Sequence, residues 1–204
     1  VTYEVVDGVA WVMLNRPATA NAQNYRLLDQ LDARLKQAVE DMAVKVIVLG
    51  GHGKHFSSGH DLGTPENDRQ MPRERVHLWY DHLAVEGAES QYVSEQDIYL
   101  GFCRRWQEIP KPMIAMVQIV ASEDAFFQDP VVRMGFPGVE YFAHAFELPP
   151  RIARELLMLG ERMPASRAPH FGMVNRLFPR ETLREEVAKI AAEIATRPRF
   201  GLAL

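Results

Sequence analysis

The sequence predicts an α/β domain with a parallel sheet and crossover helices, and three observations support this class. Residues 1–14 contain two short apolar runs joined by a turn, and residues 25–43 follow with apolar positions at helical spacing. Residues 44–49 are almost wholly apolar and rich in β-branched side chains, as expected of a strand buried on both faces. A strand, helix, strand order of this kind is typical of parallel strands linked by helices.

Turn residues and apolar periodicity define the first elements. Asp7-Gly8 is a hairpin turn signal between the two strand-like runs, and Pro17 ends the second run because proline has no N–H for a sheet ladder. The predicted helix carries apolar side chains three or four residues apart, as on the buried face of an amphipathic helix. These residues are Leu27, Leu28, Leu31, Leu35, Ala38 and Val39.

The later elements are less regular. A glycine-rich loop follows at 50–63, and the polar residues 64–97 are interpreted as a mobile excursion. An amphipathic helix is expected at 98–108 and a strand at 113–117. That strand runs directly into a second apolar segment beginning at Ile119. Because a parallel crossover needs about a dozen residues, the local sequence alone favours one long strand here.

Composition limits the classes of function. A chain of 204 residues with 47% hydrophobic residues can form one domain with a substantial core. The net charge of -4, without a dominant basic patch, argues against nucleic-acid binding, and the apolar runs are shorter than a membrane span. No secretory leader precedes the first strand, and the single cysteine, Cys103, fits a reducing compartment. We therefore expect a cytoplasmic protein.

The loop HFSSGHDLG, residues 55–63, contains residue types that suit two side-chain chemistries. Ser57 or Ser58 with His60 and Asp61 has the composition of a catalytic triad. Close neighbours in one loop rarely place base and acid in line behind a nucleophile, and no G-x-S-x-G elbow is present. A metal site is disfavoured too, because the spacing matches no common zinc motif. Its candidate ligands would be His52, His55, His60 and Asp61.

The third interpretation makes the backbone of this loop the functional group. A loop that leaves a parallel strand, with Gly59 able to adopt unusual dihedral angles, can point N–H groups into a cleft. Such donors stabilise a carbonyl oxygen that becomes negative during reaction. Ser57 and Ser58 are small enough to leave room for a ligand, and Asp61 is expected to pin the loop. We favour this interpretation over the other two.

Five segments, in order along almost the whole chain, resemble motifs of the crotonase, or enoyl-CoA hydratase/isomerase, superfamily. They are N-R-P-x-x-x-N-A at 15–22, F-x-x-G-x-D-[LI] at 56–62, K-P-x-I-A at 111–115, A-x-F…G-x-x-P-G at 125–138, and G-x-x-x-x-A-x-x-A-x-x-x-G-x-V at 160–174. The resemblance implies a ClpP/crotonase-like spiral of ββα units, with an acyl-CoA site in residues 1–148. Residues 149–204 would begin a C-terminal helical region of the same domain that assembles the protein as a homotrimer or hexamer.

The resemblance also implies a substrate and a set of site residues. The substrate would be an acyl-CoA thioester, with coenzyme A as part of the substrate and no separate cofactor or metal. The backbone N–H of His60 would be one of two oxyanion donors, and its imidazole would line the pocket. Residues of two loops would lie beside the bound acyl-CoA, namely Ala20, Ala22, Ser57, Ser58, Gly59 and Asp61.

The sequence departs from the family pattern at one junction. The glycine-rich stretch that carries the second oxyanion donor, and in many hydratases a catalytic glutamate, is missing between Gln118 and Ile119. The resemblance therefore favours two strands at this junction instead of one. We infer that the natural protein has further residues there, and we expect further helices after Leu204.

A second departure concerns the acid or base. Val131 stands where hydratases place the glutamate of a Q-P-E-like triplet, and valine cannot transfer a proton. Glu140 can replace it as acid or base, or can be a solvated loop charge, and Asp129 is a weaker candidate. The sequence thus predicts enoyl-CoA hydratase or isomerase chemistry through an oxyanion-stabilised enolate. The alternatives are another enolate reaction that uses Glu140 and a non-catalytic acyl-CoA-binding homologue.

Overall fold

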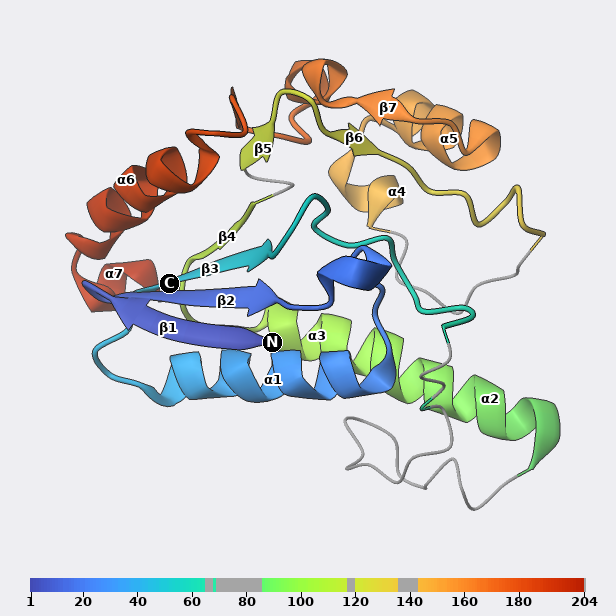
Figure 1. The fold of residues 1–204 in the computed structure, drawn as a ribbon, viewed down its shortest axis with the longest axis horizontal. Helices are drawn as coiled ribbons and strands as arrows, with labels where there is room; N and C mark the ends of the chain where they lie inside the picture. The colour runs from blue at the N-terminus through green and yellow to red at the C-terminus, as the bar shows by residue number, and fades with distance from the viewer. Residues whose placement is uncertain (65–67, 69–85, 117–119, 136–142, 204) are drawn as a thin grey trace. The chain divides into compact units, whose positions relative to one another are not determined.

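The computed structural model describes residues 1–64, 68, 86–116, 120–135 and 143–203 (Figure 1). The chain forms two compact units, one of Val1–Ile114 with Ala191–Leu204 and one of Ala115–Ile190. The predicted boundary at residue 148 divides the chain by function and stays a prediction. No helix in the described ranges is long and apolar enough to cross a bilayer.

The first unit is built on a four-stranded sheet in the order β1-β2-β3-β4. Its strands are β1 (Thr2–Val6), β2 (Val9–Leu14), β3 (Val46–Gly51) and β4 (Met113–Ala115). β1 and β2 form the predicted antiparallel hairpin, and the positive φ angles of Asp7 (49°) and Gly8 (79°) fit a type I′ turn. β2 and β3 are parallel with Leu14 opposite Gly51, so both strands end at the same edge of the sheet.

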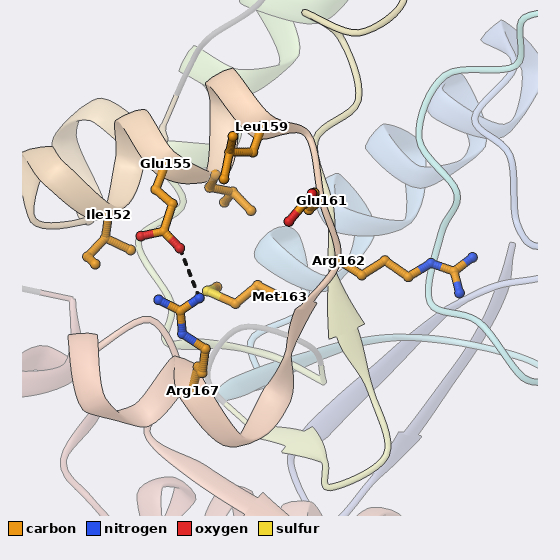
Figure 2. Close-up of a pocket in the computed structure, with 8 residues that line it drawn as sticks. Ile152, Glu155, Leu159, Glu161, Arg162, Met163 and Arg167 are labelled. Atoms are coloured by element: carbon orange, nitrogen blue, oxygen red, sulfur yellow. Dashed lines mark hydrogen bonds and ion pairs between the residues drawn. The ribbon is translucent and has the colours of Figure 1, made fainter.

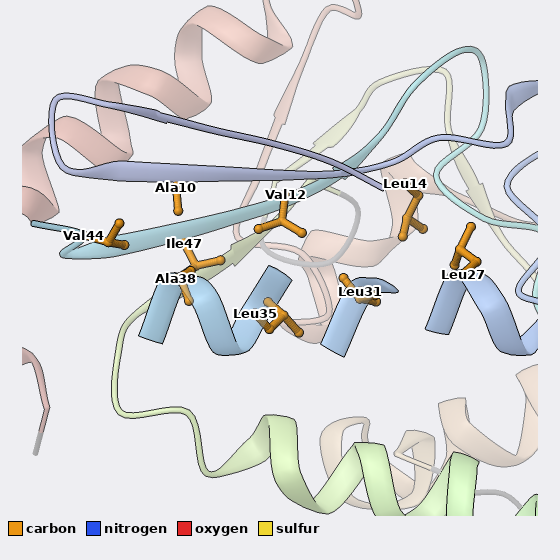
Figure 3. Close-up of a cluster of buried hydrophobic side chains, with 9 residues drawn as sticks. All are labelled: Ala10, Val12, Leu14, Leu27, Leu31, Leu35, Ala38, Val44 and Ile47. Carbon is orange, nitrogen blue, oxygen red and sulfur yellow. The ribbon is translucent and has the colours of Figure 1, made fainter. Parts of the chain in front are cut away.

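Helix α1 (Tyr25–Glu40) covers one face of this sheet, as Figure 3 shows for the core between them. The helix begins at Asn24, whose Oδ1 accepts the N–H of Leu27 at 3.1 Å. It ends three residues before the predicted end at 43, where Lys111 Nζ donates to the carbonyls of Ala38 and Asp41, each at 2.7 Å. Nine buried residues form the core, namely Ala10, Val12, Leu14, Leu27, Leu31, Leu35, Ala38, Val44 and Ile47.

A helical segment occupies the end of the region predicted as a mobile excursion. It consists of α2 (Gly87–Glu95), the π-helical turn η3 (Gln96–Leu100) and α3 (Gly101–Gln107). The prediction for 64–97 is therefore wrong for residues 87–97, because tertiary contacts bury Val93, Ser94 and Asp97 despite the polar sequence. Residues 65–67 and 69–85 lie outside the described residues.

The second unit contains two small sheets and short helices. β5 (Val120–Ser122) pairs in parallel with β8 (Arg176–Phe178), and β6 (Phe126–Phe127) pairs antiparallel with β7 (Met163–Pro164). β4 and β5 thus belong to different sheets, which confirms the expectation of two strands around residues 113–122. The helical elements are α4 (His144–Glu147), α5 (Pro150–Leu159), η4 (Ala165–Phe171) and the first part of α6 (Leu183–Ala195). From Ala191 the chain belongs to the first unit, which also contains α7 (Arg199–Leu202).

Candidate active site

The connections that leave β2 and β3 are hydrogen-bonded to each other at the edge of the sheet. The first contains the short helix η1 (Pro17–Thr19), and the second is the glycine-rich loop. The N–H of Ser58 donates to the carbonyl of Ala20 at 2.9 Å, and the N–H of Asp61 donates to the carbonyl of Gln23 at 3.1 Å. The connection after β2 therefore holds the glycine-rich loop in place through these backbone hydrogen bonds.

Asn21 joins the same two connections through its side chain. Its Nδ2 donates to the carbonyls of His52 (3.0 Å) and His55 (2.7 Å), and its Oδ1 accepts the N–H of Arg16 at 2.8 Å. The residue is completely buried and has φ of 54°, a left-handed conformation that asparagine tolerates better than most residues. The N-R-P-x-x-x-N-A pattern therefore supplies an amide that shapes the loop.

Asp61 pins the far end of the loop, as expected from the sequence. Its carboxylate accepts hydrogen bonds from Arg16 Nη1 (2.9 Å), from the hydroxyl (2.6 Å) and N–H (3.0 Å) of Thr64, and from the N–H of Gly63 (3.3 Å). Burial alone would raise the pKa of Asp61, but the bonds from Thr64, Arg16 and Gly63 outweigh it and lower the pKa to about 2. The carboxylate is thus held ionised as a structural anchor.

The peptide between Gly59 and His60 has a defined orientation. The carbonyl of Gly59 accepts the N–H of Gln23 at 2.8 Å, and Gly59 has φ of 90°, which a residue with a side chain rarely adopts. A trans peptide is planar, with its carbonyl and its N–H on opposite sides. The N–H of His60 therefore points away from the 15–24 connection, the direction needed if it is to act on a ligand.

The side chain of His60 packs against a second aromatic ring. Its imidazole stacks on Tyr99 with the ring centroids 3.8 Å apart and the planes 12° from parallel. The role of the imidazole as a pocket-wall residue and the donor role of its N–H both stay predictions. No local pattern indicates a role for Tyr99, which lies within the amphipathic helix expected at 98–108.

The hydroxyl of Ser57 is part of the loop's own hydrogen bonding. Its Oγ donates to the carbonyl of Asn21 at 3.0 Å and accepts from the N–H of Gly59 and from Gln23 Nε2, each at 3.1 Å. A serine in this environment shapes the turn, which argues against its use as a nucleophile activated by His60. The described part of the chain also contains no group of three side chains suited to a metal ion.

Asp129, the weaker acid or base candidate, lies in the second unit. Its Oδ1 accepts the N–H of Val131 at 3.1 Å, and its Oδ2 lies 3.8 Å from Nδ1 of His144. The carboxylate is thereby tied to the backbone of Val131, the position where the resemblance leads us to expect a glutamate. Glu140 and the Gln118–Ile119 junction lie outside the described residues.

A hollow in the second unit is unrelated to the predicted site residues. It is small, partly open to solvent, and lies between α5, β7 and η4 (Figure 2). An ion pair of 3.0 Å between Glu155 and Arg167 crosses it. The lining residues are Ile152, Glu155, Leu156, Leu159, Glu161, Arg162, Met163 and Arg167.

The chain matches the family model described as enoyl-CoA hydratase/isomerase in two stretches, residues 4–118 and 112–203. Among its relatives, EchA13 of Mycobacterium tuberculosis, a candidate enoyl-CoA hydratase, is 34% identical over 226 positions, which cover 100% of this chain and 71% of that protein. The 1,2-epoxyphenylacetyl-CoA isomerase of Escherichia coli is 28% identical, covering 98% of this chain and 78% of the isomerase.

Solved structures give the same match. A candidate enoyl-CoA hydratase from Mycobacterium thermoresistibile is 41% identical with a TM-score of 0.84, covering 99% of this chain and 83% of that one. The two stretches matched by the family model overlap at residues 112–118, beside the Gln118–Ile119 junction. The alignment with the M. tuberculosis relative is also longer than the 204 residues of this chain.

Proposed function

The chain belongs to the enoyl-CoA hydratase/isomerase family and has a function of that type, and we propose that it acts on an acyl-CoA thioester whose enolate is stabilised by the N–H of His60. The observation that carries the mechanism is the Gly59–His60 peptide, whose carbonyl is held by Gln23 so that its N–H faces the opposite side. One such donor contributes about 3 kcal/mol to the stabilisation of a developing oxyanion. Coenzyme A enters as part of the substrate.

The proton-transfer group is proposed to be a carboxylate. Asp129 is supported by its hydrogen bond to the N–H of Val131, which holds a carboxylate at the turn where the family has its glutamate. Glu140 follows from the sequence alone. Because Val131 has no ionisable group, a non-catalytic acyl-CoA-binding homologue is the second candidate function.

The remaining parts of the proposal concern the surroundings of the site. Ala20, Ala22, Ser57, Ser58, Gly59 and Asp61 are proposed to lie beside the acyl-CoA. Their support is that the backbones of the two connections are joined by three hydrogen bonds, which bring these residues together at one edge of the sheet, with Ala22 buried beneath them. We further propose a homotrimer or hexamer in the cytoplasm, on the family resemblance and the single cysteine.

The test is turnover of a panel of 2-enoyl-CoA and 3-enoyl-CoA thioesters of increasing chain length. Hydration is followed by loss of the conjugated thioester absorbance, and isomerisation by mass-resolved chromatography of the products. Turnover by the wild type that falls in Asp129→Asn or Glu140→Gln supports the enzyme and assigns its acid or base. Tight binding of acyl-CoA without turnover supports the non-catalytic homologue, and neither binding nor turnover would contradict both.

A further inference from the structure

The stack between His60 and Tyr99 links the predicted oxyanion loop to a helix far along the chain. The two rings lie nearly parallel with centroids 3.8 Å apart, and both belong to the first unit. The edge of the loop backbone that faces Gln23 is already held. The carbonyl of Gly59 accepts the N–H of Gln23, and the N–H of Asp61 donates to the carbonyl of Gln23. The ring of Tyr99 adds a contact to the side chain of His60.

Tyr99 reaches the loop from a π-helical turn. The turn, Gln96–Leu100, joins α2 to α3 and adds a residue relative to an α-helix, a feature that often occurs at functional sites. Its neighbours Ile98 and Phe102 are buried against Tyr25 and Leu28 of α1. We infer that the wider turn lets Tyr99 face the loop while the flanking residues stay packed on α1.

The base of this turn is buried and hydrogen-bonded. Ile98 is 1% exposed and Phe102 is 3% exposed, and the buried hydroxyl of Ser94 donates to the hydroxyl of Tyr25 at 3.1 Å. A ring carried on such a packed segment can restrict the rotation of a neighbouring residue. Gly59, by contrast, has open space around it and no side chain, so the orientation of the peptide that precedes His60 depends on the hydrogen bond from the N–H of Gln23 to the carbonyl of Gly59.

We propose that Tyr99 is a positioning residue for the oxyanion donor: its ring holds His60 so that the backbone N–H keeps one direction. The proposal rests on the proposed function, in which that N–H binds the thioester oxygen. A displacement of about 1 Å at a catalytic group can lower a rate by about a hundredfold. Loss of the stack is expected to lower kcat less than loss of the donor itself, since Gln23 still binds the carbonyl of the Gly59–His60 peptide.

The experiment compares Tyr99→Leu, which removes the ring, with Tyr99→Phe, which keeps it. Tyr92→Leu is the matched control, because Tyr92 is a half-exposed tyrosine on the preceding helix. Three quantities are measured: kcat, KM for a 2-enoyl-CoA, and the infrared band of a ¹³C-labelled thioester carbonyl in the complex. Carbonyl polarisation reports the oxyanion contact and is insensitive to a general loss of folded protein.

For Tyr99→Leu we expect kcat to fall about ten- to a hundredfold with KM changed less than about threefold, and the carbonyl band to shift less than in the wild type. Tyr99→Phe is expected to keep the kcat and the carbonyl shift of the wild type, and so is Tyr92→Leu. If Tyr99→Leu does not fold, Tyr99→Met, which keeps the side-chain bulk without the ring, gives the same comparison. Unchanged kcat and carbonyl band in the folded ringless variant would overturn the proposal, whereas a wild type without turnover or carbonyl shift would overturn the proposed function itself.

Discussion

Arg16 Nη1 lies 2.9 Å from Asp61 Oδ2, and this ion pair joins the connection after β2 to the end of the glycine-rich loop. The side chains are only 15% and 6% exposed, so solvent screens the pair weakly. A buried ion pair stabilises a fold only when its remaining hydrogen-bonding groups also have partners. Here Thr64 and Gly63 donate the further hydrogen bonds to the carboxylate of Asp61. The same pair therefore fixes the loop whose backbone is proposed to do the chemistry.

The carboxylate of Asp61 makes the free energy of unfolding decrease at acidic pH. Its pKa is about 2 in the folded state and 3.8 unfolded, so the carboxylate stabilises the fold above pH 3.8, and this contribution is lost as the pH falls towards 2. The difference corresponds to about 2 kcal/mol. We expect Asp61→Asn to lower the free energy of unfolding at pH 7 and to lessen its decline between pH 4 and about 2, measured by urea denaturation.

The control for this prediction is Glu40→Gln. Glu40 lies 3.9 Å from Lys36 in an exposed pair and should change the free energy of unfolding by less than about 0.5 kcal/mol. A decline with acid that is equally steep in Asp61→Asn and in the wild type would show that Asp61 is not the titrating anchor.

Asn21 combines a left-handed backbone with three side-chain hydrogen bonds, and the two effects can be separated. Asn21→Gly keeps the backbone conformation and loses the bonds, which we expect to cost about 3 kcal/mol of unfolding free energy. Asn21→Ala should cost about 1 kcal/mol more, because alanine disfavours φ of 54°. Asn15→Ala, at an exposed residue of the same connection, is the control for urea denaturation. Equal losses in the two Asn21 variants would contradict the role given to backbone conformation.

Three glycines of the loop region should respond differently to alanine. In Gly51→Ala the new Cβ would lie 2.7 Å from the carbonyl oxygen of Phe56 and 2.8 Å from Asn21 Nδ2, so we expect a loss of about 1–3 kcal/mol. Gly59→Ala has free space but a φ of 90°, which should cost about 1–2 kcal/mol and lower kcat by turning the His60 peptide.

Gly63→Ala is the matched control, since it has open space and no left-handed φ. Its free energy of unfolding should stay within about 0.5 kcal/mol of the wild type. Thermal and urea unfolding of the three variants test whether the loss of unfolding free energy decreases in the order Gly51→Ala, Gly59→Ala, Gly63→Ala. A loss in Gly63→Ala as large as in Gly51→Ala would mean that the loop packs differently from the arrangement described.

The junction between Gln118 and Ile119 can be tested on protein from its natural source. The sequence would yield one tryptic peptide from Trp106 to Arg133, because proline after Lys111 blocks cleavage there. We expect peptide mapping by mass spectrometry to find other residues after Gln118, since the family model matches this chain in two stretches that overlap at 112–118. Recovery of the uninterrupted peptide would instead show a true deletion and favour the non-catalytic homologue.

The sequence by itself determined the elements that depend on local patterns. Asp7-Gly8 demanded a hairpin, the leucine spacing placed the buried face of α1, and the loop motif predicted that Asp61 is an anchor. These features were predictable because turn chemistry, helical periodicity and carboxylate capping act over a few residues. The family motifs added the fold and the kind of function, which the comparisons bear out.

Only the tertiary structure decided which way the loop's peptides point and what holds them. The direction of the His60 N–H follows from a hydrogen bond between Gln23 and Gly59, and the stack of His60 on Tyr99 joins residues still further apart in the chain. The π-helical turn Gln96–Leu100 has no local signature, since it spans the end of the predicted excursion and the start of the predicted amphipathic helix. Such contacts depend on which distant segments lie together at the edge of the sheet. The helix or strand propensity of a short segment does not specify this.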